Sequence, residues 1–175
     1  SATRITASSS STWGAGWYVV NGNVTISSRI QVSGDVHLIL ADGCTLTAEE
    51  GINVAAGNSL TIYGQSKGTG ALTAKSSNNG AGIGGDYGGD GSNITINGGT
   101  VTATSYNGAG IGGGYHGDGT NITINGGTVT ATSTFSGAGI GGGDGAMNSF
   151  PEYGNGGNGR NININGGTVT ATGGD

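Results

Sequence analysis

Apolar and polar residues alternate strictly along much of this chain. Between Asn93 and Thr104, isoleucine, valine and alanine alternate with asparagine and threonine on both sides of Gly98-Gly99. Alternation with a period of two is typical of β-strands that bury one face. The pattern predicts pairs of half-buried strands joined at a glycine corner.

The same unit recurs along the sequence. Residues 79–105 (NGAGIGGDYGGDGSNITINGGTVTATS) return almost unchanged at 107–133, and again at 136–172 with an insertion. A fixed period of this size indicates a solenoid. We therefore expect an all-β fold, a parallel β-helix with three strands per coil and about five coils of ~28 residues. The crossover rule for parallel strands predicts a right-handed helix.

Three interior ladders of apolar residues can be threaded through the predicted coils. The first joins Cys44/Leu46, Leu72/Ala74, Val101/Ala103, Val129/Ala131 and Val169/Ala171. The second joins Ile30/Val32, Ile52/Val54, Ile83, Ile111 and Ile140. The third joins Val36/Leu38/Leu40, Leu60/Ile62, Ile94/Ile96, Ile122/Ile124 and Ile162/Ile164. We expect each ladder to line one interior face.

The first residues differ from the rest. Residues 1–18 are predicted to be a linker and N-terminal cap, and residues 19–175 the β-helix domain. The start is rich in serine and threonine, which suggests a module of a longer protein. Trp13, Trp17 and Tyr18 have two interpretations: they cover the open end of the solenoid, or they offer an aromatic platform to a sugar ring.

Composition excludes several classes of function. The net charge is −5 with only five Lys and Arg residues, so no basic surface for nucleic acid or an anionic membrane is expected. No apolar run approaches the ~20 residues of a membrane span. The acidic residues are scattered, and neither His37 nor His116 has an identifiable partner nucleophile in the sequence. We therefore do not expect an enzyme.

The loops that follow the GAGIGG segments are the candidate binding region, because loops on rigid scaffolds commonly carry function. Tyr87 and Tyr115 occupy equivalent positions in two repeats, and the third repeat has a longer loop. Exposed aromatic rings stack on the C–H faces of sugars. The predicted glycan-binding residues are Tyr87, Tyr115, His116, Phe150, Tyr153 and Arg160. Alternatively, the tyrosines only pack their loops onto the coils.

Aspartates in the same loops suggest a second chemistry. Asp90 and Asp118 lie at equivalent repeat positions, with Asp86 and Asp144 nearby. Stacked carboxylates repel one another unless a cation or hydrogen-bond donors intervene. Calcium bound by these four aspartates is one interpretation, and Asp-Gly turns closed by backbone hydrogen bonds are the other.

Three further repeated features each allow a structural and a functional interpretation. The glycines of GAGIGG predict either a tight bend or a flat groove floor. Asn93, Asn121 and Asn161, like Asn97, Asn125 and Asn165, are expected to form amide ladders that stabilise the stack. The repeated TVTAT segments place threonine ranks outward, an ordinary strand choice that is also similar to the flat threonine arrays of ice-binding proteins.

One known family is similar to this chain. The segment WYVVNGNVTISSRIQVSGDVHLILADGCTL, followed by repeated GAGIGGG and ITINGGTVTAT, resembles the glycine-rich β-helix modules of large surface proteins from gut-dwelling and related anaerobic bacteria. The resemblance begins at Trp17 and implies an extracellular module beside adhesion or carbohydrate-binding domains. It transfers no catalytic residue. The long loop from Gly143 to Gly159 departs from the repeat and is where specificity would lie.

The sequence thus favours a non-catalytic surface module that binds a glycan or another surface polymer through its aromatic and acidic loops. A structural stalk or a protein-binding adhesin spacer is the alternative, and ice binding through the threonine ranks is a third. No cofactor is required, with calcium the one candidate.

Overall fold

The computed structural model describes residues 1–145 and 155–175, and every regular element in them is a β-strand. Those residues contain no helix that could cross a membrane. The strands are β1 (Thr3–Ile5), β2 (Thr12–Val20), β3 (Asn23–Ile26), β4 (Ile30–Leu40), β5 (Thr45–Ala48), β6 (Ile52–Asn53), β7 (Ser59–Gly64), β8 (Ala71–Ser76), β9 (Ile83–Gly84), β10 (Gly91–Ile96), β11 (Thr100–Ser105), β12 (Ile111–Gly112), β13 (Gly119–Ile124), β14 (Thr128–Ser133), β15 (Ile140–Gly141), β16 (Gly159–Ile164) and β17 (Thr168–Thr172).

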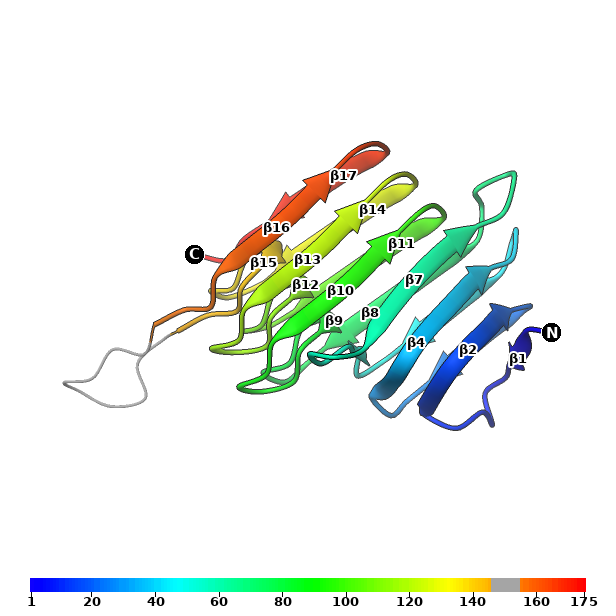
Figure 1. Ribbon diagram of the computed structural model, residues 1–175, viewed down its shortest axis with the longest axis horizontal. Helices are drawn as coiled ribbons and strands as arrows, with labels where there is room; N and C mark the ends of the chain where they lie inside the picture. The colour runs from blue at the N-terminus through cyan, green and yellow to red at the C-terminus, as the bar shows by residue number, and fades with distance from the viewer. Residues whose placement is uncertain (146–154) are drawn as a thin grey trace.

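The strands wind around one axis as successive coils (Figure 1). Each strand pairs in parallel with the equivalent strand of the next coil, as in β10 with β13 and β11 with β14. The predicted all-β parallel solenoid is confirmed. The last four coils of the described chain each hold three strands, β6–β7–β8 through β15–β16–β17.

The early coils differ from the predicted repeat. Strand β4 pairs with both β6 and β7, so one long strand covers two faces that later coils build from two strands. Strand β2 pairs with β4 along its length, and β1 pairs with β2. Strand β1 lies within residues 1–18, and β2 begins there and extends to Val20. The first coil therefore starts inside the segment predicted to be a linker and cap. Six coils result in the described residues, where about five were expected.

The register of the strands confirms the second and third ladders and corrects the first. In the second ladder Ile30, Ile52 and Ile83 align, and the strands of the third ladder pair as predicted. In the first ladder Leu46, not Cys44, lies opposite Leu72, so the predicted alignment is wrong by two residues. A slip of two keeps every side chain on its face, and alternation alone cannot detect it. Cys44 instead closes a turn, where its sulfur accepts a hydrogen bond from the Gly22 amide.

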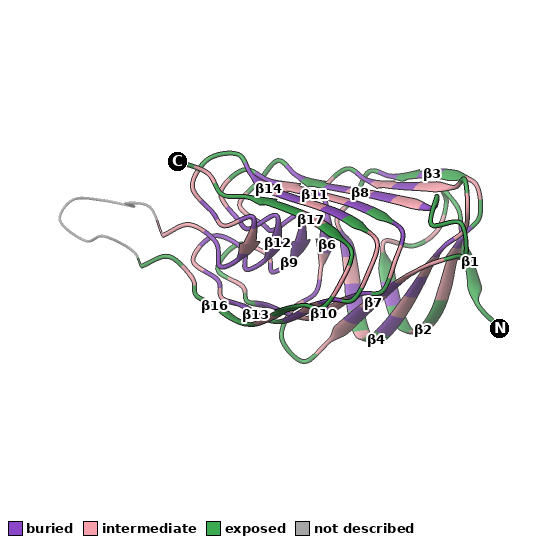
Figure 2. Ribbon diagram, turned by 90° about the horizontal axis from the view of Figure 1, so that it is seen from above, coloured by how far each residue is buried: buried purple, intermediate pink, exposed green. Residues whose placement is uncertain are grey.

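The ladders form one continuous apolar core inside the coils (Figure 2). Leu38, Ile62 and Ile96 have no exposed surface. Burial of each such side chain contributes about 1.5–3 kcal/mol, so the stack of coils is stabilised mainly from within. At the β17 end this core is uncovered, because Ile164 is 55% exposed.

Glycines in the GAGIGG segments allow neighbouring coils to touch through their backbones. Gly84 has a φ of +137°, and a Cβ there would lie 1.9 Å from the carbonyl oxygen of Gly112. Gly112 has the same conformation and meets Gly141 in the same way. The space beside these glycines is therefore occupied by the next coil. Of the two predicted interpretations, the structure supports the close-packed bend and not a groove floor.

Candidate functional site

The predicted tyrosine pair is formed by two stacked loops, β9–β10 and β12–β13. The rings of Tyr87 and Tyr115 lie 5.6 Å apart between centroids and 17° from parallel. Tyr87 is 61% exposed, whereas Tyr115 is only 7% exposed beneath it. The 28-residue repeat produces this stack, because equivalent loop positions fall on adjacent coils. The outer ring therefore rests on a buried one.

His116 completes the cluster from the same loop. Its ring meets Tyr115 edge-on at 4.0 Å, and its backbone has a left-handed φ of +64°. Its Nδ1 lies 3.3 Å from the carbonyl oxygen of Asn155. Burial, followed by the Asp144 carboxylate, raises the pKa of the Tyr115 hydroxyl. Tyr115 is therefore a neutral, fixed support at physiological pH.

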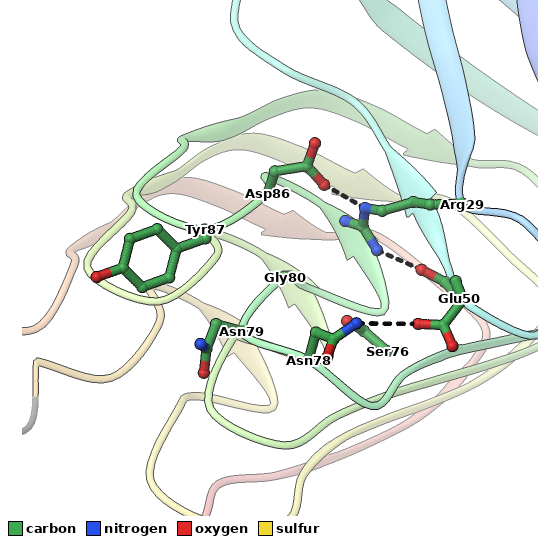
Figure 3. Close-up of a pocket in the computed structure, with 8 residues that line it drawn as sticks. All are labelled: Arg29, Glu50, Ser76, Asn78, Asn79, Gly80, Asp86 and Tyr87. Carbon is green, nitrogen blue, oxygen red and sulfur yellow. Dashed lines mark hydrogen bonds and ion pairs between the residues drawn. The ribbon is translucent and has the colours of Figure 1, made fainter.

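An open cleft of about 570 Å³ lies beside Tyr87 (Figure 3). Most of the residues that line it carry polar side chains: Arg29, Glu50, Ser76, Asn78, Asn79, Gly80, Asp86 and Tyr87. Asn78 donates through Nδ2 to Glu50 at 3.3 Å, and Asn79 accepts a hydrogen bond from Asn107 at 2.6 Å. The cleft thus combines an exposed aromatic ring with amide, hydroxyl and carboxylate groups.

Arg29 builds the back of this cleft and was missed by the sequence reasoning. Its Nε donates to Asp86, and the two side chains form an ion pair. The remaining donors reach the carbonyl oxygens of Glu50 at 2.6 Å, Ala81 at 3.0 Å and Gly85 at 3.1 Å. Burial lowers the pKa of the guanidinium, and the Asp86 charge opposes that shift. Because the donors of Arg29 are bound to Asp86 and to backbone carbonyl oxygens, its role is to shape the cleft rather than to bind a ligand directly.

A signal for Arg29 does exist in the sequence. The residues that precede the second ladder are Arg29 and then Gly51, Gly82, Gly110 and Gly139. A Cβ on Gly51 would lie 2.6 Å from an Arg29 nitrogen. Arginine at a position where every later coil has glycine indicates a side chain that extends over those glycines to the neighbouring coils.

Three of the four aspartates predicted to hold calcium accept hydrogen bonds from different groups of the protein. Asp86 is bound by Arg29 and Asn53. Asp90 accepts the backbone amide of Asp118 at 2.8 Å, and Asp118 accepts the amide of Asn158 at 2.6 Å. Backbone donors therefore relieve the repulsion expected of stacked carboxylates.

No group of three or more His, Cys, Asp or Glu residues in the described part of the chain could hold a metal ion. Asp86, Asp90, Asp118 and Asp144 are thus not gathered into one site there. The carboxylates of Asp90 and Asp118 each accept a backbone amide from the following coil, so they link coils rather than close their own turns. Calcium binding stays a prediction that their placement does not support.

The remaining predicted ligand residues lie elsewhere. Arg160 is exposed on β16, opposite Thr120, and does not line the cleft. Phe150 and Tyr153 lie outside the described residues. Of the six residues predicted to bind a glycan, the structure thus brings together Tyr87, Tyr115 and His116.

The predicted asparagine ladders form as expected. Asn125 donates to Asn97 and Asn165 donates to Asn125, each at 2.8 Å. The second ladder joins Asn93, Asn121 and Asn161 at 3.1–3.2 Å. These three residues have φ between +51° and +54°, a conformation that asparagine tolerates better than most residues. The ladders are structural.

Comparison with protein families supports the fold. Residues 94–115, 122–144 and 162–175 match the family model described as beta helix repeat. The chain carries β-helix repeats. The three matches begin within β10, β13 and β16 of the β-helix, and they leave the first three coils, β9 and the loop of Tyr87 outside. Comparison with curated proteins and with solved structures found no match.

Proposed function

We propose that this β-helix is a non-catalytic, extracellular module that binds carbohydrate at the Tyr87 cleft. The observation that carries the proposal is the Tyr87 ring, which is 61% exposed and stacked on buried Tyr115 beside a polar cleft. Exposed aromatic rings with neighbouring hydrogen-bonding groups are suited to sugars, which present C–H faces and hydroxyl groups together.

The cleft is also held in place before any ligand arrives. Arg29 connects Glu50 to Asp86, and Tyr115 fixes the plane of Tyr87. A rigid site loses little conformational entropy on binding. In this proposal the Tyr87 ring stacks on one sugar ring while Asn78, Asn79 and Glu50 bind its hydroxyls.

A glycan array, run with calcium and again with a chelator, tests the proposal. Tyr87→Ala is expected to weaken binding of any captured glycan at least tenfold, because the stacking ring is removed. Tyr106→Ala is the matched control: Tyr106 is 48% exposed and stacks on Phe135, and it does not line the cleft. Loss of binding in the chelator arm alone would support the calcium hypothesis. A blank array with folded protein would favour a stalk or protein-binding spacer.

The threonine face supports a second candidate function, binding of ice. The central rank runs unbroken through all six coils as Thr25, Thr47, Thr73, Thr102, Thr130 and Thr170. This is twice the three rungs expected from the sequence. Thermal hysteresis of the purified chain, abolished by Thr130→Tyr, would support this function, and its absence would eliminate it.

A further inference from the structure

A second aromatic surface lies on the outer side of the first coils. Trp17 projects from β2 and is 45% exposed, whereas Trp13, on the same strand, is 1% exposed within the core. The Trp17 ring stacks on His37 of β4, with centroids 4.3 Å apart and planes 14° apart. It also stacks on Tyr63 of β7 at 5.3 Å. Three successive coils thus contribute one ring each.

Hydrogen bonds fix the two supporting rings. The Tyr63 hydroxyl lies 3.2 Å from Nδ1 of His37, and Nε2 of His37 lies 3.1 Å from Asp35. Ser59 donates its hydroxyl to the other oxygen of Asp35. A chain of four side chains therefore holds His37 flat against Trp17. A merely tolerated surface tryptophan would need no such support.

Trp17 is the end of this stack. Strand β1 begins at Thr3, opposite Tyr18, and so stops one residue short of the position opposite Trp17. The next coil supplies His37 opposite Trp17. Trp17 therefore has an aromatic partner on its β4 side, and no strand of the described chain pairs beside it on the other.

We propose that Trp17, backed by His37 and Tyr63, is a second carbohydrate subsite that takes neutral, β-linked pyranose rings. Pyranoses with equatorial substituents present flat C–H faces, which stack on an indole ring. Asp35 borders the stack with a 64% exposed side chain, and its carboxylate can accept sugar hydroxyls. This carboxylate and the net charge of −5 disfavour uronic acids and sulfated sugars.

This inference rests on the proposed function in one respect, the choice of carbohydrate as the class of ligand. The Tyr87 cleft is lined by Arg29, which precedes β4, and by residues between Glu50 and Tyr87 that lie outside β7. Trp17 stands on β2, His37 on β4 and Tyr63 on β7. The two surfaces share no residue. Each can therefore be removed without touching the other.

The chain contains only two tryptophans, which makes fluorescence a direct test. Cellohexaose and chitohexaose serve as neutral probes, and a uronic acid hexamer serves as the charged one. We expect a neutral probe to shift the tryptophan emission and to protect the exposed indole from iodide quenching. Trp17→Ala, whose binding is followed by calorimetry because the substitution also removes the reporter, is expected to weaken binding of the neutral probe at least fivefold.

Tyr87→Ala separates the two sites. If Trp17 is a subsite, this variant keeps the fluorescence response of the unmodified chain, even if its array signal falls. If neither neutral probe changes Trp17 fluorescence, or if only the uronic acid hexamer does, the inference is overturned while the Tyr87 proposal stands. If Trp17→Ala weakens binding of the neutral probe at least fivefold and Tyr87→Ala fails to alter array binding, the inference holds and the Tyr87 proposal fails.

Discussion

The two halves of this β-helix are held together by different means. Before residue 79, contacts between coils come from particular side chains: Trp17 stacks on rings from the next two coils, and Arg29 reaches beyond residue 79 to Ala81. After residue 79, coils are joined by contacts that recur at equivalent positions of each repeat, such as the side-chain hydrogen bonds from Asn125 to Asn97 and from Asn165 to Asn125. We call residues 1–78 the specific half, because its contacts between coils are each made by different side chains. Residues 79–175 are the periodic half, because its contacts repeat from coil to coil.

The difference has a physical cause. Where coils are near-copies, equivalent groups meet on adjacent rungs, and self-complementary groups such as amides can bond along the stack. Glycine then allows backbones to approach directly, as at Gly84 and Gly112. Where coils differ in length, each contact must be built individually. Arg29 and Asp86 join the two regimes, and the candidate cleft forms at this junction.

The largest expected effect comes from Gly84→Ala in the periodic half. The added Cβ would lie 1.9 Å from the Gly112 oxygen, at a φ of +137°. We expect a loss of more than about 4 kcal/mol in the free energy of unfolding, measured by urea denaturation.

Gly68→Ala is the matched control in the specific half. Gly68 also has a positive φ, +66°, but nothing lies within 4 Å of its Cβ position. It should lose only about 1–2 kcal/mol. Equal losses in the two variants would show that backbone contact between coils does not distinguish the halves.

Arg29→Met should have the next largest effect, because it removes the link between the halves. The substitution leaves several carbonyl oxygens without their donor and Asp86 without its ion pair. Removal of one member of a buried ion pair costs about 3–5 kcal/mol, and the partial exposure of Asp86 places the expected loss near the lower value.

Arg4→Met provides the comparison for Arg29. Arg4 is exposed and donates one hydrogen bond, to the Asn21 carbonyl oxygen. Its loss is expected to stay within about 0.5 kcal/mol. If urea unfolding of Arg29→Met matches that of Arg4→Met, Arg29 does not connect the halves energetically.

The sequence predicted the periodic half far better than the specific one. Repetition placed Tyr87 over Tyr115 and aligned the asparagines, because equivalent positions in parallel coils must stack. Irregular coils gave no such constraint, so the Cys44 alignment slipped by two residues. The alternation of apolar and polar residues predicts which face of the sheet a side chain lies on, but not which residue of the next coil lies opposite it.

The same limit applies to the candidate sites. Arg29 meets Asp86 across 57 residues, and His37 meets Tyr63 across 26, with no repeat to pair them. Each contact depends on the exact number of residues in the intervening turns. The sequence therefore predicted the aromatic part of the Tyr87 cleft and missed its polar wall.

The two halves are also expected to differ, by a smaller amount, in how their stability depends on pH. In the specific half, the hydrogen bond from Ser59 lowers the pKa of Asp35 below its ordinary value of 3.8. A lowered folded-state pKa means that the ionised carboxylate stabilises the fold above the unfolded-state value, and that this contribution disappears as the pH falls through the folded-state pKa. The Asn97–Asn125–Asn165 ladder carries no titrating group, so it should hold across the same acidic range.

Ser59→Ala tests this assignment because it removes the main cause of the shift. The pKa of Asp35, followed by NMR of its side-chain carboxyl carbon, is expected to rise toward 3.8. Thr61→Ala, two residues along β7, deletes a hydroxyl from the same strand and should leave that pKa in place. An unchanged pKa in Ser59→Ala would mean that His37, rather than Ser59, holds the carboxylate ionised.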